Sequence, residues 1–267
     1  MESVGLIMFA NIYKNKKVLV TGHTGFKGTW LTMWLLKLGA NIVGISKDIP
    51  TSPSMFEELK LKDKIEHYQE DIRDLSKMTE IMAYEKPDFL FHLAAQAIVS
   101  TSYTNPIETI TSNVVGTANI LEALRESNHK CAIIIITSDK AYDNVEQVWG
   151  YKEDDKMGGK DIYSGSKGAA ELIIKSYYHS FFKSNKSNIK LAIGRAGNVI
   201  GGGDWANDRI VVDCMEAWSK RQSVEIRSPE ATRPWQHVLE PLSGYLNLGT
   251  ELYGDDNLHG EAFNFGP

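Results

Sequence analysis

The sequence has little cysteine, no excess of basic residues and no long apolar run, and each of these absences excludes a class of protein. Only two cysteines, Cys131 and Cys214, occur among 267 residues, so there is no disulfide framework, and both thiols fit a reducing compartment. The net charge is −5, whereas nucleic-acid-binding proteins usually carry an excess of basic residues. No stretch reaches the ~20 apolar residues that a membrane helix needs. The sequence therefore predicts a cytoplasmic protein with no nucleic-acid or membrane partner.

The remaining composition is that of a globular protein, and the pattern along the chain is that of an α/β fold. Apolar residues make up 42% of the sequence and charged residues 24%, so the chain can bury a full core without a disulfide or metal. Apolar, β-branched runs alternate with amphipathic stretches, which indicates repeated βαβ units. We expect strands at 17–21, 42–45, 65–69, 89–93, 132–137 and 191–195, and helices at 28–38, 75–85, 107–126 and 164–182. Right-handed crossovers then predict a doubly wound parallel Rossmann sheet, with ligands at the carboxyl ends of its strands.

Three glycines on a three-residue spacing follow the first predicted strand. Gly22, Gly25 and Gly28 lie in GHTGFKG, directly after KVLVT and before a predicted helix. Glycine lets the backbone turn tightly and approach a pyrophosphate, while the helix N-terminus offers free N–H groups and a positive dipole end. A glycine trio also occurs in ordinary turns, but the strand before it and the helix after it favour a dinucleotide site. The residues expected to bind the cofactor here are Gly22, Thr24, Gly25, Phe26, Lys27 and Gly28.

The end of the second predicted strand bears on the choice between NAD and NADP, and it favours NAD without excluding NADP. NAD enzymes place an acid about 20 residues past the glycines, where it binds the adenosine ribose. Ser46 ends this strand and Lys47 and Asp48 follow it. Asp48 can serve as the acid if the strand ends late, whereas Lys47 can meet the 2′-phosphate of NADP. Ser46 is counted among the cofactor-binding residues, and a serine there suggests looser retention of the cofactor.

Two further strand ends are expected to contribute to the same site. Asp71 and Ile72 follow the third predicted strand, where adenine can lie, and small residues after His92 let a cofactor approach the backbone. Each has an ordinary structural explanation as well, a helix cap for Asp71 and packing for the alanines. The cofactor-binding residues expected at these ends are Asp71, Ile72, Leu93, Ala94, Ala95 and Gln96.

The character of the chain changes after residue 195. Glycine, tryptophan and charged residues crowd together in GNVIGGGDWANDR and RSPEATRPWQHV, which are typical of irregular segments that line a pocket. We therefore predict a Rossmann domain with its NAD site at 1–195. A smaller substrate-binding lobe at 196–267 is expected to send segments back to that domain.

Tyr163 and Lys167 form a candidate catalytic pair at the start of a predicted helix. Their spacing of four residues puts both side chains on one helix face. A lysine ammonium beside a phenol lowers the pKa of the phenol, because it favours the charged form. Such a phenol can take a hydroxyl proton while hydride leaves the same carbon for nicotinamide. The alternative is a solvated surface pair, and the dinucleotide fold makes the catalytic interpretation the better one.

A second candidate cluster ends the predicted strand that carries four consecutive isoleucines. Ser138, Asp139 and Lys140 stand directly after this strand, where open α/β sheets carry their chemistry. They put a hydroxyl, an acid and a base in series, which is more than the oxidation of an alcohol requires. The alternative is a turn with solvated charges.

Together these motifs resemble the CDP-glucose 4,6-dehydratases, within the extended short-chain dehydrogenase/reductase family. The resemblance rests on GHTGFKGTW, HLAAQ, SNVVGT, TSDKAYDN, YSGSK, GRAGNVIGGGDWANDR and RPWQHVLEPLSGY, and it spans nearly the whole chain from about Lys16. Epimerases of the superfamily lack the Asp-Lys pair, so TSDK favours a dehydratase. A similar TSDK occurs in the inverting UDP-N-acetylglucosamine 4,6-dehydratases, the nearest alternative. A sugar-nucleotide epimerase and an inactive NAD-binding protein remain as further alternatives.

The resemblance implies an NAD-dependent dehydration of a nucleotide-linked hexose, with CDP-glucose as the favoured substrate. Tyr163, tuned by Lys167, takes the proton from the sugar 4-hydroxyl as hydride passes to NAD, and Ser138 hydrogen-bonds the same oxygen. Lys140 then removes the C5 proton, and protonated Asp139 donates to the departing 6-hydroxyl. Hydride returns to C6, which leaves a 4-keto-6-deoxyhexose and regenerated NAD. A lysine base must be neutral when it acts, so we expect burial and a cation such as Lys167 to lower the pKa of Lys140.

The resemblance also implies substrate contacts and a homodimer. The substrate-binding residues are expected to be Asn198, Arg209 and Arg233, and Asn113 within SNVVGT joins the cofactor-binding residues. Arginine suits the oxygens of a nucleotide diphosphate, although a surface ion pair is the alternative for each arginine. The helices 107–126 and 164–182 carry apolar stripes that family members pair in a four-helix dimer contact, and covering the sheet is the alternative. Family members continue beyond Pro267, so the substrate lobe is expected to be incomplete here.

Overall fold

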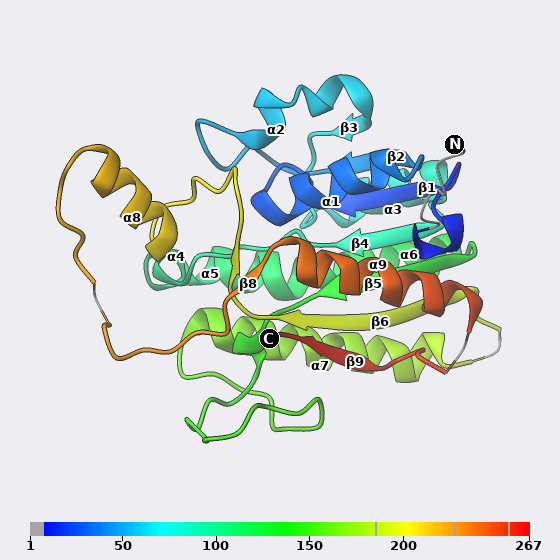
Figure 1. Cartoon of the computed structure of the whole chain (residues 1–267). Coiled ribbons are helices and arrows are strands. Elements are labelled where there is room, and N and C mark those ends of the chain that lie inside the picture. The colour runs from blue at the N-terminus through cyan, green and yellow to red at the C-terminus, as the bar shows by residue number, and fades with distance from the viewer. Residues whose placement is uncertain (1–7, 185, 227, 256) are drawn as a thin grey trace, which may run out of the picture.

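The computed structural model describes residues 8–184, 186–226, 228–255 and 257–267, and its centre is a parallel sheet (Figure 1). Seven strands follow the order β3-β2-β1-β4-β5-β6-β9, and every neighbouring pair is parallel. The strands are β1 (Lys17–Thr21), β2 (Asn41–Ile45), β3 (Glu66–Tyr68), β4 (Phe89–His92), β5 (Cys131–Ile136), β6 (Ile189–Ala196) and β9 (Ala262–Phe265). The order of the first six is that of a dinucleotide-binding Rossmann sheet, so the predicted fold class is confirmed.

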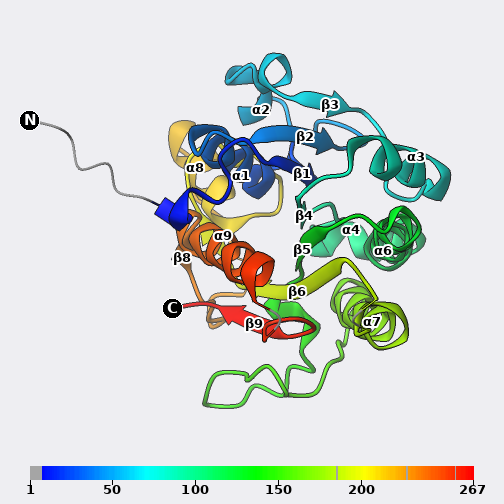
Figure 2. The ribbon, with the colours of Figure 1, turned by 90° about the vertical axis from the view of Figure 1, so that its right-hand side faces the viewer.

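Helices cover both faces of the sheet, as Figure 2 shows. One layer holds α1 (Phe26–Lys37) and α9 (Leu239–Gly254), and the other holds α3 (Leu75–Glu85), α6 (Gly116–Ser127) and α7 (Ile162–Tyr177). The isoleucine run of β5 explains this, because Ile134 and Ile136 face the first layer while Ile133 and Ile135 face the second. A strand buried on both faces needs apolar residues at every position.

The predicted elements agree with the structure to within about two residues at each end. The two long predicted helices differ in one respect, because each contains a π-helical segment, Thr111–Val115 in the first and Tyr178–Phe182 in the second. The remaining short elements are η1 (Met8–Asn11), α2 (Met55–Glu58), η2 (Leu61–Lys64), α4 (Val99–Thr104), α5 (Pro106–Ile110), η3 (Thr111–Val115), η4 (Asp139–Ala141), η5 (Tyr178–Phe182), β7 (Val199–Ile200), α8 (Ile210–Ser219) and β8 (Gln236–His237).

Sequence analysis missed α8, α9 and β9. The helix α9, LEPLSGYLNLGTELYG, contains a proline and glycines, residues that disfavour a helix. The structure shows why they are tolerated: Pro241 lies in the first turn, where no backbone N–H is lost. At Gly249 a side chain would meet the Tyr13 hydroxyl at 2.5 Å, so only glycine lets α9 pack this closely.

The chain between β6 and α9 leaves the sheet and forms an irregular segment at 197–238. It contains the two-stranded ladder of β7 and β8, and it carries α8 outward from the rest of the molecule (Figure 1). Across the described residues, no helix is both long and apolar enough to cross a membrane. The irregular segment passes over the carboxyl ends of the strands, where the candidate site lies.

Candidate active site

The carboxyl ends of β1, β4, β5 and β6 open into one long cleft with a volume of about 2970 Å³. Pockets for one drug-sized ligand measure about 300–1,000 Å³, so this cleft has room for a dinucleotide and a second ligand. Every predicted site residue lines it except Asn113. Sequence motifs that lie up to about two hundred residues apart therefore meet in one place, as expected at this edge of a parallel sheet.

The turn after β1 forms a cradle of glycines. Gly22 has a φ of +73°, and a side chain there would meet the backbone nitrogen of Ala94 at 2.8 Å. A side chain at Gly28 would collide with the carbonyl oxygen of Gly22. The helix α1 begins at Phe26, and its N-cap, Gly25, provides no side-chain hydrogen bond, so the first N–H groups of the helix are free. A pyrophosphate fits this cradle, because its oxygens accept hydrogen bonds from such groups.

The end of β2 lies beside this turn and favours NAD over NADP. The buried Ser46 hydroxyl forms a hydrogen bond with His23 Nδ1 at 3.0 Å, so it helps to hold the turn. The Lys47 ammonium donates to Glu108 Oε1 at 2.7 Å. Because Lys47 is paired in this way, it does not offer an open cation to a 2′-phosphate. The Asp48 side chain is exposed at the rim of the cleft.

Asp71 and Ile72 line the cleft after β3, as expected for the adenine end. The Asp71 carboxylate accepts hydrogen bonds from Arg73 Nε at 2.9 Å and from its terminal nitrogen. Burial raises the pKa of Asp71, but the hydrogen bonds from Arg73 outweigh it and hold the pKa below its ordinary value. The carboxylate is therefore ionised at neutral pH. The helix cap considered as its alternative role belongs to Asp74, whose side chain accepts from Lys77 N–H.

Asn113 is the predicted cofactor residue that the structure places elsewhere. It is buried behind the cleft wall, with an exposed fraction of 2%. Its Oδ1 accepts from Gln96 N–H at 2.8 Å, and its Nδ2 donates to Ser166 Oγ at 2.9 Å. Gln96 lies after β4 and Ser166 lies between Tyr163 and Lys167 in α7, so Asn113 joins the two walls of the cleft. It does so from the π-helical segment, a type of helix distortion that is frequent at functional sites.

The cluster after β5 is held by its own hydrogen bonds. The Ser138 hydroxyl donates to Asp139 Oδ1 at 2.9 Å and accepts from Lys140 N–H at 3.2 Å. Ser138 is thereby the N-cap of the short helix η4. This cap orients the three side chains, which all line the cleft. Lys140 is half-buried, so the enclosure expected around a lysine base is incomplete in this structure.

Tyr163 and Lys167 lie on the first turns of α7, which Asp161 caps by accepting from Ser164 N–H at 2.9 Å. Burial raises the pKa of Tyr163 to about 12, against a lowering effect of the Ser138 hydroxyl. Asp139 raises it further and Arg209 lowers it. Removal from water therefore outweighs any lowering by Lys167, and the net shift of this pKa is opposite to the expected one. Lys167 is buried too, and its own pKa is lowered to about 8.

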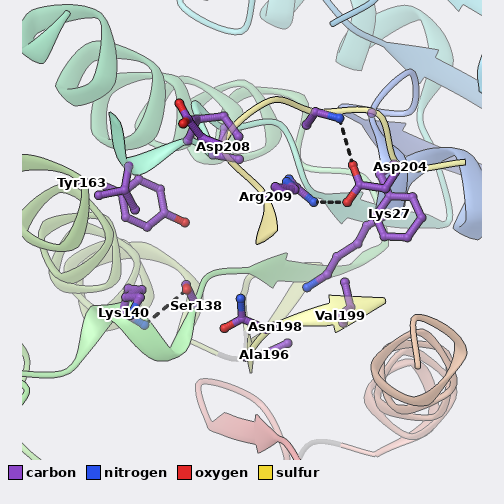
Figure 3. A pocket seen from close by; sticks show the side chains of 18 of the residues that line it. Lys27, Ser138, Lys140, Tyr163, Ala196, Asn198, Val199, Asp204, Asp208 and Arg209 are labelled. Carbon is purple, nitrogen blue, oxygen red and sulfur yellow. Dashed lines mark hydrogen bonds and ion pairs between the residues drawn. The ribbon is translucent and has the colours of Figure 1, made fainter. Parts of the chain in front are cut away.

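The irregular segment brings the predicted substrate residues to the cleft to different degrees. Figure 3 shows Asn198 and Arg209 close to the catalytic cluster. A nitrogen of the Arg209 guanidinium donates to Asp204 Oδ2 at 2.7 Å, which leaves its other nitrogens open to a ligand. Arg233 lies at the exposed rim and donates to the carbonyl oxygen of Thr232 at 2.6 Å.

Sequence analysis missed a buried ion pair beneath the site. Arg195 and Glu171 form a two-pronged contact with a shortest distance of 2.6 Å, and their side chains are exposed by 1% and 0%. Glu171 also accepts from the Thr137 hydroxyl at 2.6 Å, one residue before the catalytic cluster. The pair therefore joins β5, β6 and α7 directly below the reacting groups. Glu171 follows Lys167 by four residues on the same helix face, which is the signal that could have revealed it.

One family model and several known proteins are similar to this chain. The model for GDP-mannose 4,6 dehydratase matches residues 19–249. The CDP-glucose 4,6-dehydratase of Salmonella typhimurium is 49% identical over 260 residues, which cover 96% of this chain and 72% of that protein. The CDP-paratose 2-epimerase of Salmonella typhi is 28% identical over a match that covers 94% of this chain and 78% of that protein.

A solved structure adds a further comparison. The UDP-glucuronic acid 4-epimerase of Bacillus cereus, in complex with UDP-glucuronic acid and NAD, has a TM-score of 0.80 and 25% identity, and the match covers 94% of this chain and 77% of that one. Sequence motifs, sheet order and the family model agree. The resemblance to the CDP-glucose 4,6-dehydratases is confirmed, and this chain belongs to the GDP-mannose 4,6-dehydratase family.

Proposed function

We propose that this chain is an NAD-dependent lyase that dehydrates a nucleotide-linked hexose and converts CDP-glucose to CDP-4-keto-6-deoxyglucose. The observation that carries the proposal is that Tyr163 and the cluster Ser138, Asp139 and Lys140 line one cleft beside the glycine cradle. An epimerase needs the tyrosine but not the pair Asp139 and Lys140. The 49% identity to a CDP-glucose 4,6-dehydratase supports the same activity and the same nucleotide.

The residues of the cradle fit NAD. A side chain at Gly22 or Gly28 would collide with the neighbouring backbone, so only glycine allows this tight turn, and the first N–H groups of α1 are free to hold the pyrophosphate. The buried Lys167 ammonium makes no hydrogen bond within the part of the chain that the structure describes, and it can hold ribose hydroxyls. NAD held there would supply reversible hydride transfer for the reaction.

The side chains of the cleft divide the proton transfers between them. Tyr163 takes the proton of the 4-hydroxyl, and Ser138 hydrogen-bonds the same oxygen. Lys140, in its neutral form, removes the C5 proton made acidic by the 4-ketone, and Asp139, in its protonated form, gives a proton to the 6-hydroxyl, which leaves as water. The Lys140 ammonium then returns the proton to C5 as hydride is added at C6. Because burial raises the pKa of Tyr163 to about 12, the phenol is protonated at neutral pH. Proton abstraction therefore requires cations near it, an effect that Arg209 already exerts.

The direct test is to incubate the chain with NAD and CDP-glucose and to analyse both the sugar and the cofactor. We expect a 4-keto-6-deoxy sugar with no net NADH. The same assay with UDP-N-acetylglucosamine and dTDP-glucose tests the nucleotide and the sugar. Net accumulation of NADH would instead indicate a dehydrogenase, an intact hexose inverted at C4 an epimerase, and no turnover a non-catalytic binding protein.

Lys140→Met separates the two halves of the proposed reaction. Oxidation at C4 does not need Lys140, so the variant should stall with bound NADH, visible by its absorbance at about 340 nm, and should release no 4-keto-6-deoxy product. Full dehydration by this variant would refute the assignment of Lys140 as the base. Lys47→Met, at the other end of the cleft, is the matched control and should dehydrate normally.

We also propose a homodimer formed through the helices α4, α5 and α7. Apolar side chains on this surface are exposed, with fractions of 72% for Tyr103, 70% for Ile107 and 58% for Leu172. The apolar stripe of α6, in contrast, is buried against the sheet. Light scattering during gel filtration should give twice the monomer mass, and Ile107→Glu combined with Leu172→Glu should give the monomer. A monomeric wild type at micromolar concentration would contradict the dimer.

The proposal also covers the compartment of the enzyme and the segment that binds its substrate. We place the enzyme in the cytoplasm, because both cysteines are free and Cys131 is buried. We assign substrate binding to the irregular segment 197–238, while β9 is an edge strand of the Rossmann sheet and α9 covers one of its faces.

A further inference from the structure

Lys27 differs from the other residues of the glycine cradle, because its side chain leaves the cradle. It is the second residue of α1, and side chains on a helix tilt toward the N-terminus, so this one extends past the helix end. Figure 3 shows the Lys27 ammonium directed into the cleft, toward Asn198 and the catalytic cluster. The backbone of Lys27 thus belongs to the cradle, whereas its ammonium lies in the part of the cleft that holds the catalytic cluster.

The charged groups around this ammonium come from the catalytic and substrate sides of the cleft. They are Arg209 of the irregular segment, Asp139 after β5 and Lys167 of α7. Burial, followed by repulsion from Arg209, lowers the pKa of Lys27 to about 8, although Asp139 opposes this. Arg209 and Asp139 also act on Tyr163, so Lys27 and Tyr163 approach the same space from different walls.

This cation lacks a partner of its own. Within the described residues, Lys27 Nζ makes no hydrogen bond and no ion pair, whereas Arg209 is bonded to Asp204. Lys27 is half-buried, and an ammonium that is partly removed from water beside two like charges is unfavourable until an anion joins it. The cradle already offers helix N–H groups to the cofactor pyrophosphate, so the anion that Lys27 lacks is that of the second ligand.

We propose that Lys27 binds the diphosphate of the nucleotide-sugar substrate together with Arg209, while its backbone serves the cofactor. This inference depends on the proposed function in that the second ligand is a nucleotide diphosphate. It makes Lys27 a substrate-binding residue, and it places one residue between the two ligands of the cleft.

The test measures binding, not turnover, by titration calorimetry of the full chain with CDP, cytidine and NAD. Lys27→Met removes the charge at nearly constant length and should weaken CDP about ten- to hundred-fold, the worth of one charged hydrogen bond. Cytidine and NAD should bind as before, and Lys27→Arg should retain most of the CDP affinity. The matched control is Lys47→Met, in the same cleft but paired with Glu108, which should leave CDP binding unchanged.

A second measurement covers the case in which Lys27→Met does not fold. At pH 8 the wild type should take up protons on binding CDP, because the anion raises the pKa of a half-protonated lysine, and calorimetry in two buffers of different ionisation enthalpy measures this uptake. Lys27→Arg, which stays charged, should take up fewer protons. Unchanged CDP affinity in Lys27→Met, or equal proton uptake in Lys27→Arg, would overturn the inference. So would an equal loss of NAD affinity, which would assign the side chain to the cofactor.

The outcomes separate this inference from the proposed function. A chain that binds CDP through Lys27 and does not dehydrate CDP-glucose refutes the proposed activity and supports the inference. A chain that dehydrates CDP-glucose while Lys27→Met binds CDP normally refutes the inference alone.

Discussion

The two walls of the cleft are built in different ways. On the cofactor side, backbone atoms of the glycine cradle form the surface, and they are fixed by a sheet whose strands β1, β4 and β5 are almost wholly buried. On the substrate side, side chains of the irregular segment 197–238 form the surface, and this segment is largely exposed. It is tied to the body by hydrogen bonds, such as Trp30 Nε1 donating to the Gly202 carbonyl oxygen at 2.9 Å and Ser100 donating to Asp208 at 2.6 Å. Val199 and Val238, near its two ends, are buried in the core.

This difference predicts what a substitution does on each side. A change in the cradle or below it disturbs packed backbone, so it should lower stability and cofactor binding together. A change of a side chain that only faces the ligand should lower binding or rate and leave the folded state intact. The following variants test this division.

Tyr163→Phe should have the largest effect on rate. It removes the hydroxyl that accepts the substrate proton, and general base catalysis contributes about 10²–10⁴-fold. We expect kcat to fall by that factor, with CDP and NAD affinities and the melting temperature nearly unchanged. Steady-state kinetics, calorimetry and thermal unfolding give the three readings, and activity within tenfold of the wild type would show that Tyr163 is not the base.

Arg195→Met should have the largest effect on stability. It leaves the Glu171 carboxylate buried without its partner, which costs about 3–5 kcal/mol. Denaturant unfolding should show this loss. Arg233→Met is the matched control in the exposed segment and should change the free energy of unfolding by no more than about 0.5 kcal/mol. Equal losses in both variants would break the contrast between the two sides.

Gly28→Ala should lower both the stability of the protein and its affinity for NAD. Its methyl group collides with the Gly22 carbonyl oxygen, and overpacking of this kind costs about 1–3 kcal/mol. NAD should bind much more weakly, as measured by its stabilisation of the protein in thermal unfolding. Gly202→Ala, in the irregular segment with open space around it, should change neither stability nor NAD binding. Normal NAD binding by Gly28→Ala would contradict the cradle.

Acid should destabilise the cofactor side through two buried histidines. Burial lowers the pKa of His23 to about 4 and that of His92 to about 3, below the ordinary value of 6.5. The unfolded state therefore binds more protons below pH 6.5, and stability is lost as the pH falls toward 4. Each histidine should cost about 1–2 kcal/mol between pH 7 and pH 5. Denaturant unfolding at both values measures this, and His92→Asn should reduce the difference; a difference unchanged in that variant would exclude His92.

Site residues in short local motifs could be predicted from the sequence, whereas properties that depend on packing could not. The glycine turn, the cluster at 138–140 and the pair Tyr163 and Lys167 were recognised because each is a short motif beside a strand or helix of strong pattern. Asn113 was assigned to the cofactor because its motif shows which segment lies near the site, whereas its burial depends on how α5, η3 and α7 pack. The pKa of Tyr163 was predicted in the wrong direction because desolvation depends on everything that surrounds a group, not on one neighbour in sequence.

By itself, the sequence determined the order of strands and helices up to β6, the anion-binding turn and the family, because apolar periodicity, glycine spacing and motif residues are local properties. Only the tertiary structure decided that β9 extends the sheet, that α9 covers one of its faces and that Arg195 meets Glu171 under the catalytic groups. It alone also decided that the Lys27 ammonium points into the cleft toward the catalytic cluster. These are contacts between residues distant in the chain, and their energies depend on burial and charge that appear only when the segments are packed together.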